Sequence, residues 1–307
     1  RTAPGFLDMT YDESELYNNL GVQTVKGIDI EDILAVGDKL DDSAVEKELR
    51  DLLDKCASTD FGRPKMEDVA RLHLAARKIC EDERLDAMAF SCWPKLGDLR
   101  GMKPCVATAM LDGMGIPASC EGDMLSAISM LALQAMGSCS TAVMDLPAFD
   151  FSDDTLLLWH CGCAPFDMAD PHGVRCLPHY RAQFDTKTGD DRDGPVTDLK
   201  FSAGPVTVFR FSGNGERFFC FSGEVFETDK PSWDGSRGWV RNLKMYGDAI
   251  SSRDLMNTIL SGGLQHHYPM ALRDLSEEAE EAAVWMGLKR APRLRYSDGL
   301  RAWPRNT

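Results

Sequence analysis

The sequence predicts an α/β protein with two domains, one at residues 1–146 and one at residues 147–307. In the first part, short apolar runs alternate with segments of helical periodicity, the pattern of a parallel sheet covered by helices. The second part holds short β-rich runs separated by turns such as residues 213–215 (GNG), which is typical of an antiparallel barrel or sandwich. A length of 307 residues agrees with two domains.

The first eighty residues are expected to form a short helix, a strand and two longer helices. Residues 22–30 alternate loosely between apolar and polar side chains, which favours the strand. Residues 43–55 carry apolar side chains at helical spacing behind a capping box that begins at Ser43, so we predict an amphipathic helix. Residues 66–80 repeat that spacing and predict a second helix, in which His73 is a packed or solvated residue.

Strands and helices then alternate up to residue 145, and we expect the strands to lie parallel in one layer. Asp123 caps a helix that is apolar nearly all round and is therefore expected to be buried. The expected elements are strands at residues 87–92 and 116–120, a strand ending at residue 145, and helices at residues 102–112 and 124–136.

The second part is expected to be rich in strands, with two further helices. The expected strands are residues 156–159, 206–211, 217–226 and 239–244, the helices are residues 252–260 and 276–286, and the loops are residues 186–198 and 262–268.

Charge and hydropathy argue against two classes of partner. The formal net charge is −15, from 49 acidic and 34 basic residues, whereas nucleic acids and anionic membranes favour basic surfaces. The longest apolar run is far shorter than the about 18 residues that a membrane span requires. No charged-then-apolar leader is visible, and because the chain opens on Arg1 rather than Met, processing or truncation is expected to have preceded it.

The sequence contains 10 cysteines, most of them inside apolar runs, and no pair of C-x-x-C motifs of the zinc-binding kind. We interpret them as buried free thiols of a protein in a reducing compartment and expect a cytoplasmic location. The closest pair, Cys161 and Cys163, follows His160; it could be redox-active, but packing around the imidazole is the favoured interpretation.

Two carboxylates and three imidazoles stand at the ends of apolar runs or in a loop: Glu121, Asp145, His160, His266 and His267. Open α/β sheets carry their chemistry just past the carboxyl ends of strands, so these residues suggest one site built from separate loops. A mixed oxygen and nitrogen donor set suits Mn²⁺, Co²⁺, Mg²⁺ or Fe²⁺ better than thiolate-binding ions.

A sugar isomerisation would fit such a centre. An octahedral ion with three or four protein ligands keeps positions open for a vicinal carbonyl and hydroxyl. Glu121 and Asp145 could then shuttle a proton between C1 and C2 through an enediol. Each residue alone has an ordinary interpretation: Glu121 as a capping carboxylate, Asp145 as a turn residue and His160 as a core histidine. A histidine doublet is often incidental, and spacing alone does not bring these places together.

Five short motifs, in this order, resemble the L-fucose/L-arabinose isomerase superfamily, in particular the fucose isomerase-like proteins. They are residues 115–123 (GIPASCEGD), 143–145 (VMD), 158–162 (LWHCG), 237–241 (RGWVR) and 262–268 (GGLQHHY). The resemblance spans roughly residues 85 to 290. It implies a Rossmann-like parallel-sheet domain, a carboxy-terminal β-barrel domain with helices, and aldose–ketose isomerisation with a divalent ion, commonly Mn²⁺.

The resemblance also implies roles for single residues. The family's metal glutamate falls on Glu121, and its second carboxylate falls on Asp145, an aspartate as in the fucose branch. Its late histidine ligand falls on His267, and His160 matches a ligand position of the arabinose branch. The two carboxylates would also be the catalytic acid–base pair.

Substrate and partners follow from the same resemblance. His266 would face a small-molecule sugar, and Trp239 would stack on it. Family members carry a further amino-terminal α/β domain that helps to close the active site, often across subunits. We therefore expect a homo-oligomer, with that domain missing, removed or contributed by a separate chain.

Two alternatives remain open from the sequence. A non-catalytic relative that acts as a structural or regulatory subunit would explain the missing domain. A metal-assisted hydrolase could use the same ligands to activate water, but no further base is recognisable. The sequence does not name the sugar.

Overall fold

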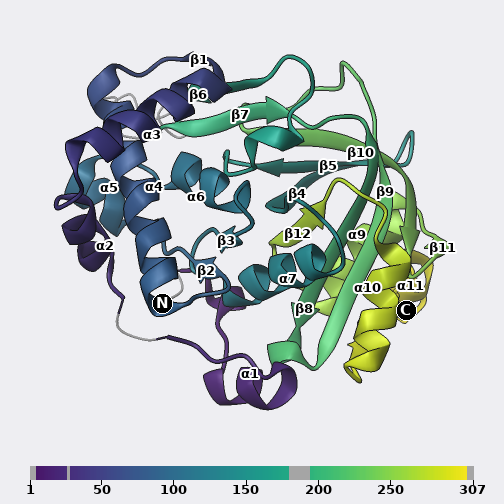
Figure 1. Cartoon of the computed structure of the whole chain (residues 1–307). Coiled ribbons are helices and arrows are strands. Elements are labelled where there is room, and N and C mark those ends of the chain that lie inside the picture. Colours follow the sequence, from purple (N-terminus) through teal and green to yellow (C-terminus); the bar gives the residue numbers. More distant parts are fainter. Residues whose placement is uncertain (1–4, 26–27, 180–193, 303–307) are drawn as a thin grey trace.

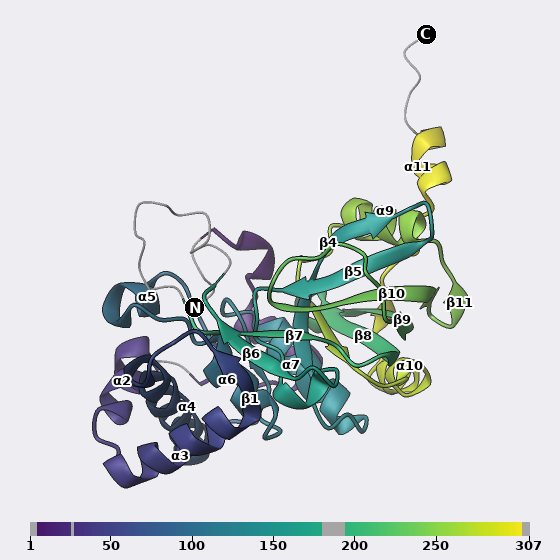
Figure 2. The same ribbon diagram turned by 90° about the horizontal axis from the view of Figure 1, so that it is seen from above.

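A mixed α/β architecture organises the chain. The computed structural model describes residues 5–25, 28–179 and 194–302. In that part, a mixed sheet of 11 strands accompanies a small pair of parallel strands (Figure 1). Figure 2 shows helices α2 (Ile30–Gly37), α3 (Asp42–Lys55) and α4 (Arg63–Glu83) gathered on one side, with the long strands on the other.

Helices α3 and α4 confirm the two amphipathic helices predicted before residue 80. The cap of α3 is Asp41, whose carboxylate accepts a hydrogen bond from the Ser43 amide (2.8 Å), so the prediction that Ser43 caps this helix was wrong. His73 is buried in α4, in agreement with the packed interpretation.

The strand predicted at residues 22–30 is absent from the described residues of that range, and Ile30 begins helix α2. The Asp32 carboxylate accepts a hydrogen bond from the Asp29 amide (2.9 Å), which stabilises the first turn. Ile30 and Ile33 are buried against the helical core. Capping and burial therefore outweigh the loose alternation of apolar residues.

The small parallel sheet confirms the strand–helix–strand prediction, although its strands are shorter than expected. Strand β2 (Met88–Ala89) pairs with β3 (Ala118–Ser119), and helix α6 (Cys105–Asp112) lies between them in sequence. Helix α7 (Met124–Ala135) follows, and the Asp123 carboxylate accepts a hydrogen bond from the Ser126 amide (3.0 Å) as its cap.

Strand β4 (Ala142–Asp150) does not join this layer, so the prediction of a third parallel strand at residue 145 was wrong. It lies between β5 (Thr155–His160) and β12 (Tyr268–Ala271) and is antiparallel to both. Asp145 lies opposite Trp159 across the β4–β5 pair. The large sheet gives β4 two neighbouring strands, whereas the small sheet pairs only two residues of each strand.

Successive antiparallel pairs join six strands and return to the first. The path runs from β10 through β5, β4, β12, β8 and β9 and back to β10. The members introduced here are β8 (Gly204–Ser212), β9 (Arg217–Val225) and β10 (Ser236–Met245). Apolar side chains of these strands, such as Val208 and Phe221, form a common buried core.

Shorter elements extend the sheet or cover it. The strands are β1 (Cys56–Thr59), β6 (Val174–Leu177), β7 (Val196–Lys200), β11 (Asp248–Ala249) and β13 (Lys289–Arg290). The helices are α1 (Glu13–Leu20), α5 (Lys95–Arg100), α9 (Ser252–Gly262), α10 (Ser276–Trp285) and α11 (Tyr296–Ala302), with 3₁₀ turns η1 (Leu7–Met9), η2 (Phe166–Met168) and η3 (Gly213–Gly215).

Helices α9 and α10 confirm the last two helix predictions. Strand β7 corrects the end of the loop predicted at residues 186–198, because residues 196–198 pair with β6. Residues 186–193 of that prediction lie outside the described part of the chain. Among the described residues, no helix combines the length and the apolar character needed to cross a membrane.

Gly235 is expected to be intolerant of a side chain. It has a φ of +125°, and a Cβ atom there would lie 2.3 Å from the His160 carbonyl oxygen. We expect Gly235→Ala to lower the free energy of unfolding by about 2 kcal/mol or more, through strain and overpacking. The matched control is Gly247→Ala, since Gly247 also has a positive φ (+79°) but no atom within 4 Å of the added Cβ. Equal urea midpoints for the two variants would contradict this expectation.

Candidate metal centre

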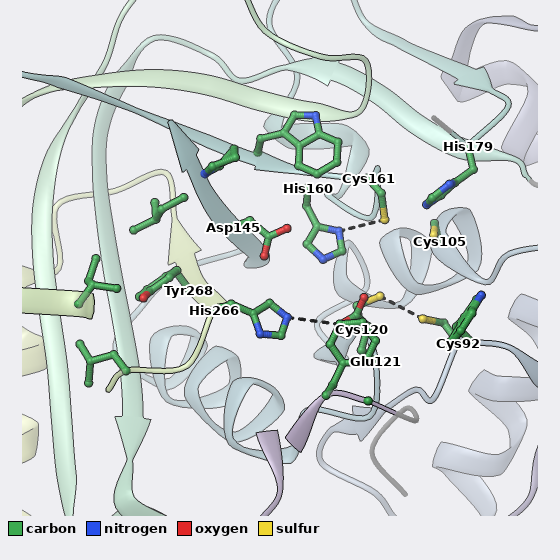
Figure 3. A pocket seen from close by; sticks show the side chains of 18 of the residues that line it. Cys92, Cys105, Cys120, Glu121, Asp145, His160, Cys161, His179, His266 and Tyr268 are labelled. Carbon is green, nitrogen blue, oxygen red and sulfur yellow. Dashed lines mark hydrogen bonds and ion pairs between the residues drawn. The ribbon is translucent and has the colours of Figure 1, made fainter. Parts of the chain in front are cut away.

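A cavity of about 730 Å³ lies where the small sheet meets the ends of β4, β5 and β12. Cavities of this size hold small-molecule ligands in other proteins. Figure 3 shows the polar side chains that face one another across it: Glu121, Asp145, His160 and His266.

The predicted ligands form two overlapping groups. Glu121, His266 and His267 make the first group, and Asp145, His160 and His267 make the second. Within each group the candidate ligand atoms all lie within 4.8 Å of one another. His267 belongs to both, so the structure brings together residues from four separate stretches of the chain.

A strained turn presents Glu121. This residue lies two positions after the end of β3 and has a φ of +62°, which is uncommon for a residue with a side chain. The Gly122 amide donates a hydrogen bond to the Phe90 carbonyl (3.0 Å), and the Asp123 amide donates to the Cys120 carbonyl (3.1 Å). These bonds hold the turn between β3 and α7, and strain of this kind is often found at functional sites.

Asp145 and His160 come from neighbouring strands of the large sheet. His160 ends β5 and lies opposite Ser236 of β10. Its Nδ1 atom lies 3.3 Å from the Cys161 sulfur and 3.4 Å from the Cys163 sulfur, which agrees with the predicted packing role of these thiols. Because Nδ1 is engaged, Nε2 is the atom of His160 left to bind a ligand.

A buried ion pair holds His267 in place. Its Nδ1 atom lies 3.2 Å from Asp123 Oδ2, and its main-chain carbonyl accepts a hydrogen bond from Arg210 Nη1 (2.9 Å). Arg210 also donates to Asp123 (2.9 Å), and the two side chains are 1% and 0% exposed. Burial opposes the charge of Asp123, but Arg210 and His267 hold its pKa well below the usual range. A carboxylate behind a histidine in this way fixes its tautomer and directs Nε2 toward a metal.

His266 is oriented by the amino-terminal segment. Its main-chain amide (3.2 Å) and its Nδ1 atom (2.7 Å) both contact Asp8 Oδ2, in the 3₁₀ turn η1. The Phe6 ring lies 5.5 Å from the imidazole, centroid to centroid. Burial lowers the pKa of His266, but the nearby carboxylates of Glu121 and Asp8 outweigh it and raise that pKa to about 9.

Two buried carboxylate oxygens have no hydrogen-bond partner among the described residues: Glu121 Oε2 and Asp145 Oδ1. The nearest imidazole nitrogens to Glu121 Oε2, those of His266 and His267, lie at 3.4 and 3.6 Å, which is too long for an N–H···O bond. Burial raises the pKa of Asp145, and the neighbouring imidazoles only partly offset this. A divalent cation would compensate both carboxylates, so the donor set fits the predicted ion.

One predicted substrate residue stands apart from the cavity. Trp239 is buried in β10, its indole nitrogen donates to the Pro231 carbonyl (3.2 Å), and it is not among the described residues that line the cavity. Trp93 and Trp159 do line it.

Sequence reasoning missed three residues that position the histidines: Asp8, Asp123 and Arg210. Asp123 was recognised only as a helix cap. The available signal for a further role was that this helix begins just after Glu121, a candidate ligand. Nothing in the local pattern marked Asp8, which lies 258 residues from His266.

No family model matches the chain. Comparison with curated proteins finds relatives named sulfoquinovose isomerase. Those of Priestia aryabhattai and Priestia megaterium are each 27% identical over 169 residues, which cover 55% of this chain and 38% of the relative. That of Alkalicoccus urumqiensis is 23% identical over 167 residues, which cover 54% of this chain and 38% of the relative. The chain is thus similar, at low identity and over well under half of their length, to proteins named as sugar isomerases.

Proposed function

We propose that this chain is a divalent-metal-dependent aldose–ketose isomerase, or the catalytic part of one. The observation that carries the proposal is that Glu121, Asp145, His160 and His267, four residues expected from the sequence to be ligands, fall into two overlapping groups that share His267. Glu121, Asp145 and His160 also line one cavity. The similarity to proteins named sulfoquinovose isomerase supports the same class of reaction.

Glu121, Asp145, His160 and His267 would hold the ion, Mn²⁺ in the first place and Co²⁺ or Mg²⁺ as alternatives. When bound, the ion polarises the substrate carbonyl and acidifies the neighbouring C–H bond. Asp123 keeps His267 oriented through Nδ1, and Cys161 and Cys163 do the same for His160. These contacts fix the imidazoles before substrate arrives.

The two carboxylates would carry the proton. One accepts it from the hydroxyl-bearing carbon and a proton is returned to the neighbouring carbon, while the hydroxyl proton passes to the former carbonyl oxygen. The aldose and the ketose are therefore isomers and no co-reactant is consumed. Glu121 and Asp145 both line the cavity, where burial limits competing water. His266, held by Asp8, would donate a hydrogen bond to the sugar from Nε2.

Sulfoquinovose, the sugar in the names of the relatives, is the first substrate to test, with L-fucose and L-arabinose beside it because of the motif resemblance. We also infer that the six-strand ring, which includes β4 (Ala142–Asp150), is the barrel of that superfamily, and that the Rossmann-like domain predicted at residues 1–146 is made by the residues before β4. A cytoplasmic homo-oligomer, with a further amino-terminal domain on the same or another chain, completes the proposal.

A non-catalytic subunit is the second candidate, because the match covers only 38% of the length of the two Priestia relatives. Metal binding without turnover of any aldose would favour it. Retention of every predicted ligand favours the enzyme.

Metal dependence is the test of this proposal. We expect chelator-treated protein to form no ketose from the aldose panel and to regain activity with Mn²⁺. At a metal concentration about 100 times Kd, binding should stabilise the fold by about 2.7 kcal/mol, seen as a higher melting temperature. Elemental analysis of the dialysed protein gives the stoichiometry. Ketose formation unaffected by chelation, or no melting shift with Mn²⁺, Co²⁺ or Mg²⁺, would overturn the proposal.

A further inference from the structure

Tyr268 lines the cavity and carries a buried phenolic hydroxyl without a hydrogen-bond partner among the described residues. The residue is 2% exposed and lines the cavity, yet among the described residues its Oη atom has no hydrogen-bond partner. A buried hydroxyl without a partner has lost its hydrogen bonds to water and has not replaced them, which destabilises the unliganded protein.

The position of this hydroxyl is fixed by its surroundings. Tyr268 begins strand β12 and lies opposite Met144 of β4, one residue before Asp145. Its ring packs edge to face against Phe219, with centroids 5.9 Å apart. The side chain therefore has little freedom to carry Oη to another partner.

The walls of the cavity on this side are apolar. Met256 and Ile259 of α9, with Leu264 just after it, line the same cavity and offer no hydrogen-bonding side chain. Figure 3 shows Tyr268 on one side of Asp145, whereas the thiols of Cys105 and Cys161 lie on the other. A ligand that filled the cavity from the centre toward α9 would lie against Tyr268.

We propose that Tyr268 binds one hydroxyl group of the sugar chain beyond the two reacting carbons and so determines substrate specificity. This inference rests on the proposed isomerase function. It assigns a protein contact to a part of the sugar that takes no part in the reaction. A site that hydrogen-bonds a substrate hydroxyl discriminates against the analogue that lacks it, because a buried polar group is then left unpaired.

The test compares kcat/KM of Tyr268→Phe and of the wild-type protein for an aldose that the wild type converts and for its monodeoxy analogues. We expect kcat/KM of the variant for the full sugar to fall about ten- to a hundredfold. The reason is that the sugar hydroxyl loses a hydrogen bond and is left desolvated without a partner. The monodeoxy analogue that lacks the hydroxyl bound by Tyr268 should be converted with the same kcat/KM by both proteins. The melting temperature of the metal-loaded, sugar-free variant should be unchanged or higher, because only an unpaired hydroxyl is removed.

Tyr246→Phe is the matched control. The Tyr246 hydroxyl donates to the carbonyls of Phe218 (3.1 Å) and Ala291 (3.0 Å), so its loss should lower the melting temperature and leave kcat/KM unchanged. Equal kcat/KM of Tyr268→Phe and wild type on every sugar that the wild type converts would overturn the inference alone. A wild-type protein that converts and binds no sugar would overturn the proposed function, and the inference with it.

Discussion

Replacing Glu121 by glutamine is expected to lower kcat/KM for the aldose by about a thousandfold or more, within the range of a lost general acid–base group. The glutamine has nearly the same volume, so the cavity keeps its shape. It removes one of the two carboxylates that would bind the ion and one of the two groups that would take the proton. We expect the affinity for Mn²⁺ to fall as well, measured by titration with a metal-sensitive dye.

Glu83→Gln gives the matched control, because Glu83 is an exposed residue at the end of α4. It should leave both kcat/KM and metal affinity unchanged. The Glu121→Gln variant should also melt no lower than wild type in the absence of metal, since the substituted oxygen has no hydrogen-bond partner among the described residues. Full activity in Glu121→Gln would remove this residue from the reaction.

Replacing Arg210 by methionine is expected to cost about 3–5 kcal/mol of folding free energy, the usual result of breaking a buried ion pair on one side. Arg210 donates to Asp123, to Ser126 Oγ (2.6 Å) and to the His267 carbonyl. Methionine fills most of the volume but leaves the Asp123 charge buried beside α7. Urea unfolding of the metal-free protein measures the loss.

Two further variants separate charge from packing. Asp123→Asn combined with Arg210→Met should recover part of the lost stability, because no uncompensated charge remains and asparagine still caps α7. Arg241→Met breaks an exposed pair with Glu224 (2.8 Å) and should cost less than about 1 kcal/mol. A single variant Arg210→Met as stable as Arg241→Met would show that the buried pair does not stabilise the fold.

The same pair links stability to the metal site. Arg210 and Asp123 both contact His267, so at temperatures where Arg210→Met is still folded its metal affinity should fall about ten- to a hundredfold, as expected for a partner behind a metal ligand.

Local pattern was a good guide wherever the structure depends on neighbours in sequence. The apolar spacing at residues 43–55 and 124–136 gave α3 and α7 within one residue at either end. The same reasoning failed at residues 22–30, where a capped first turn and two buried isoleucines favour a helix. It also failed for the partner strands of β4, since periodicity carries no information about which strand lies alongside.

By itself, the sequence determined which side chains are candidate ligands and where they stand: carboxylates and imidazoles at the ends of apolar runs, in an order that resembles a family of isomerases. Only the tertiary structure decided that His267 belongs to both ligand groups, that Trp239 lies away from the cavity, and that Arg210 meets Asp123 across 87 residues. The physical reason is that a site of this kind is made by packing. Its members are distant in the chain, and the contacts that orient them depend on which surfaces are buried together rather than on any local repeat.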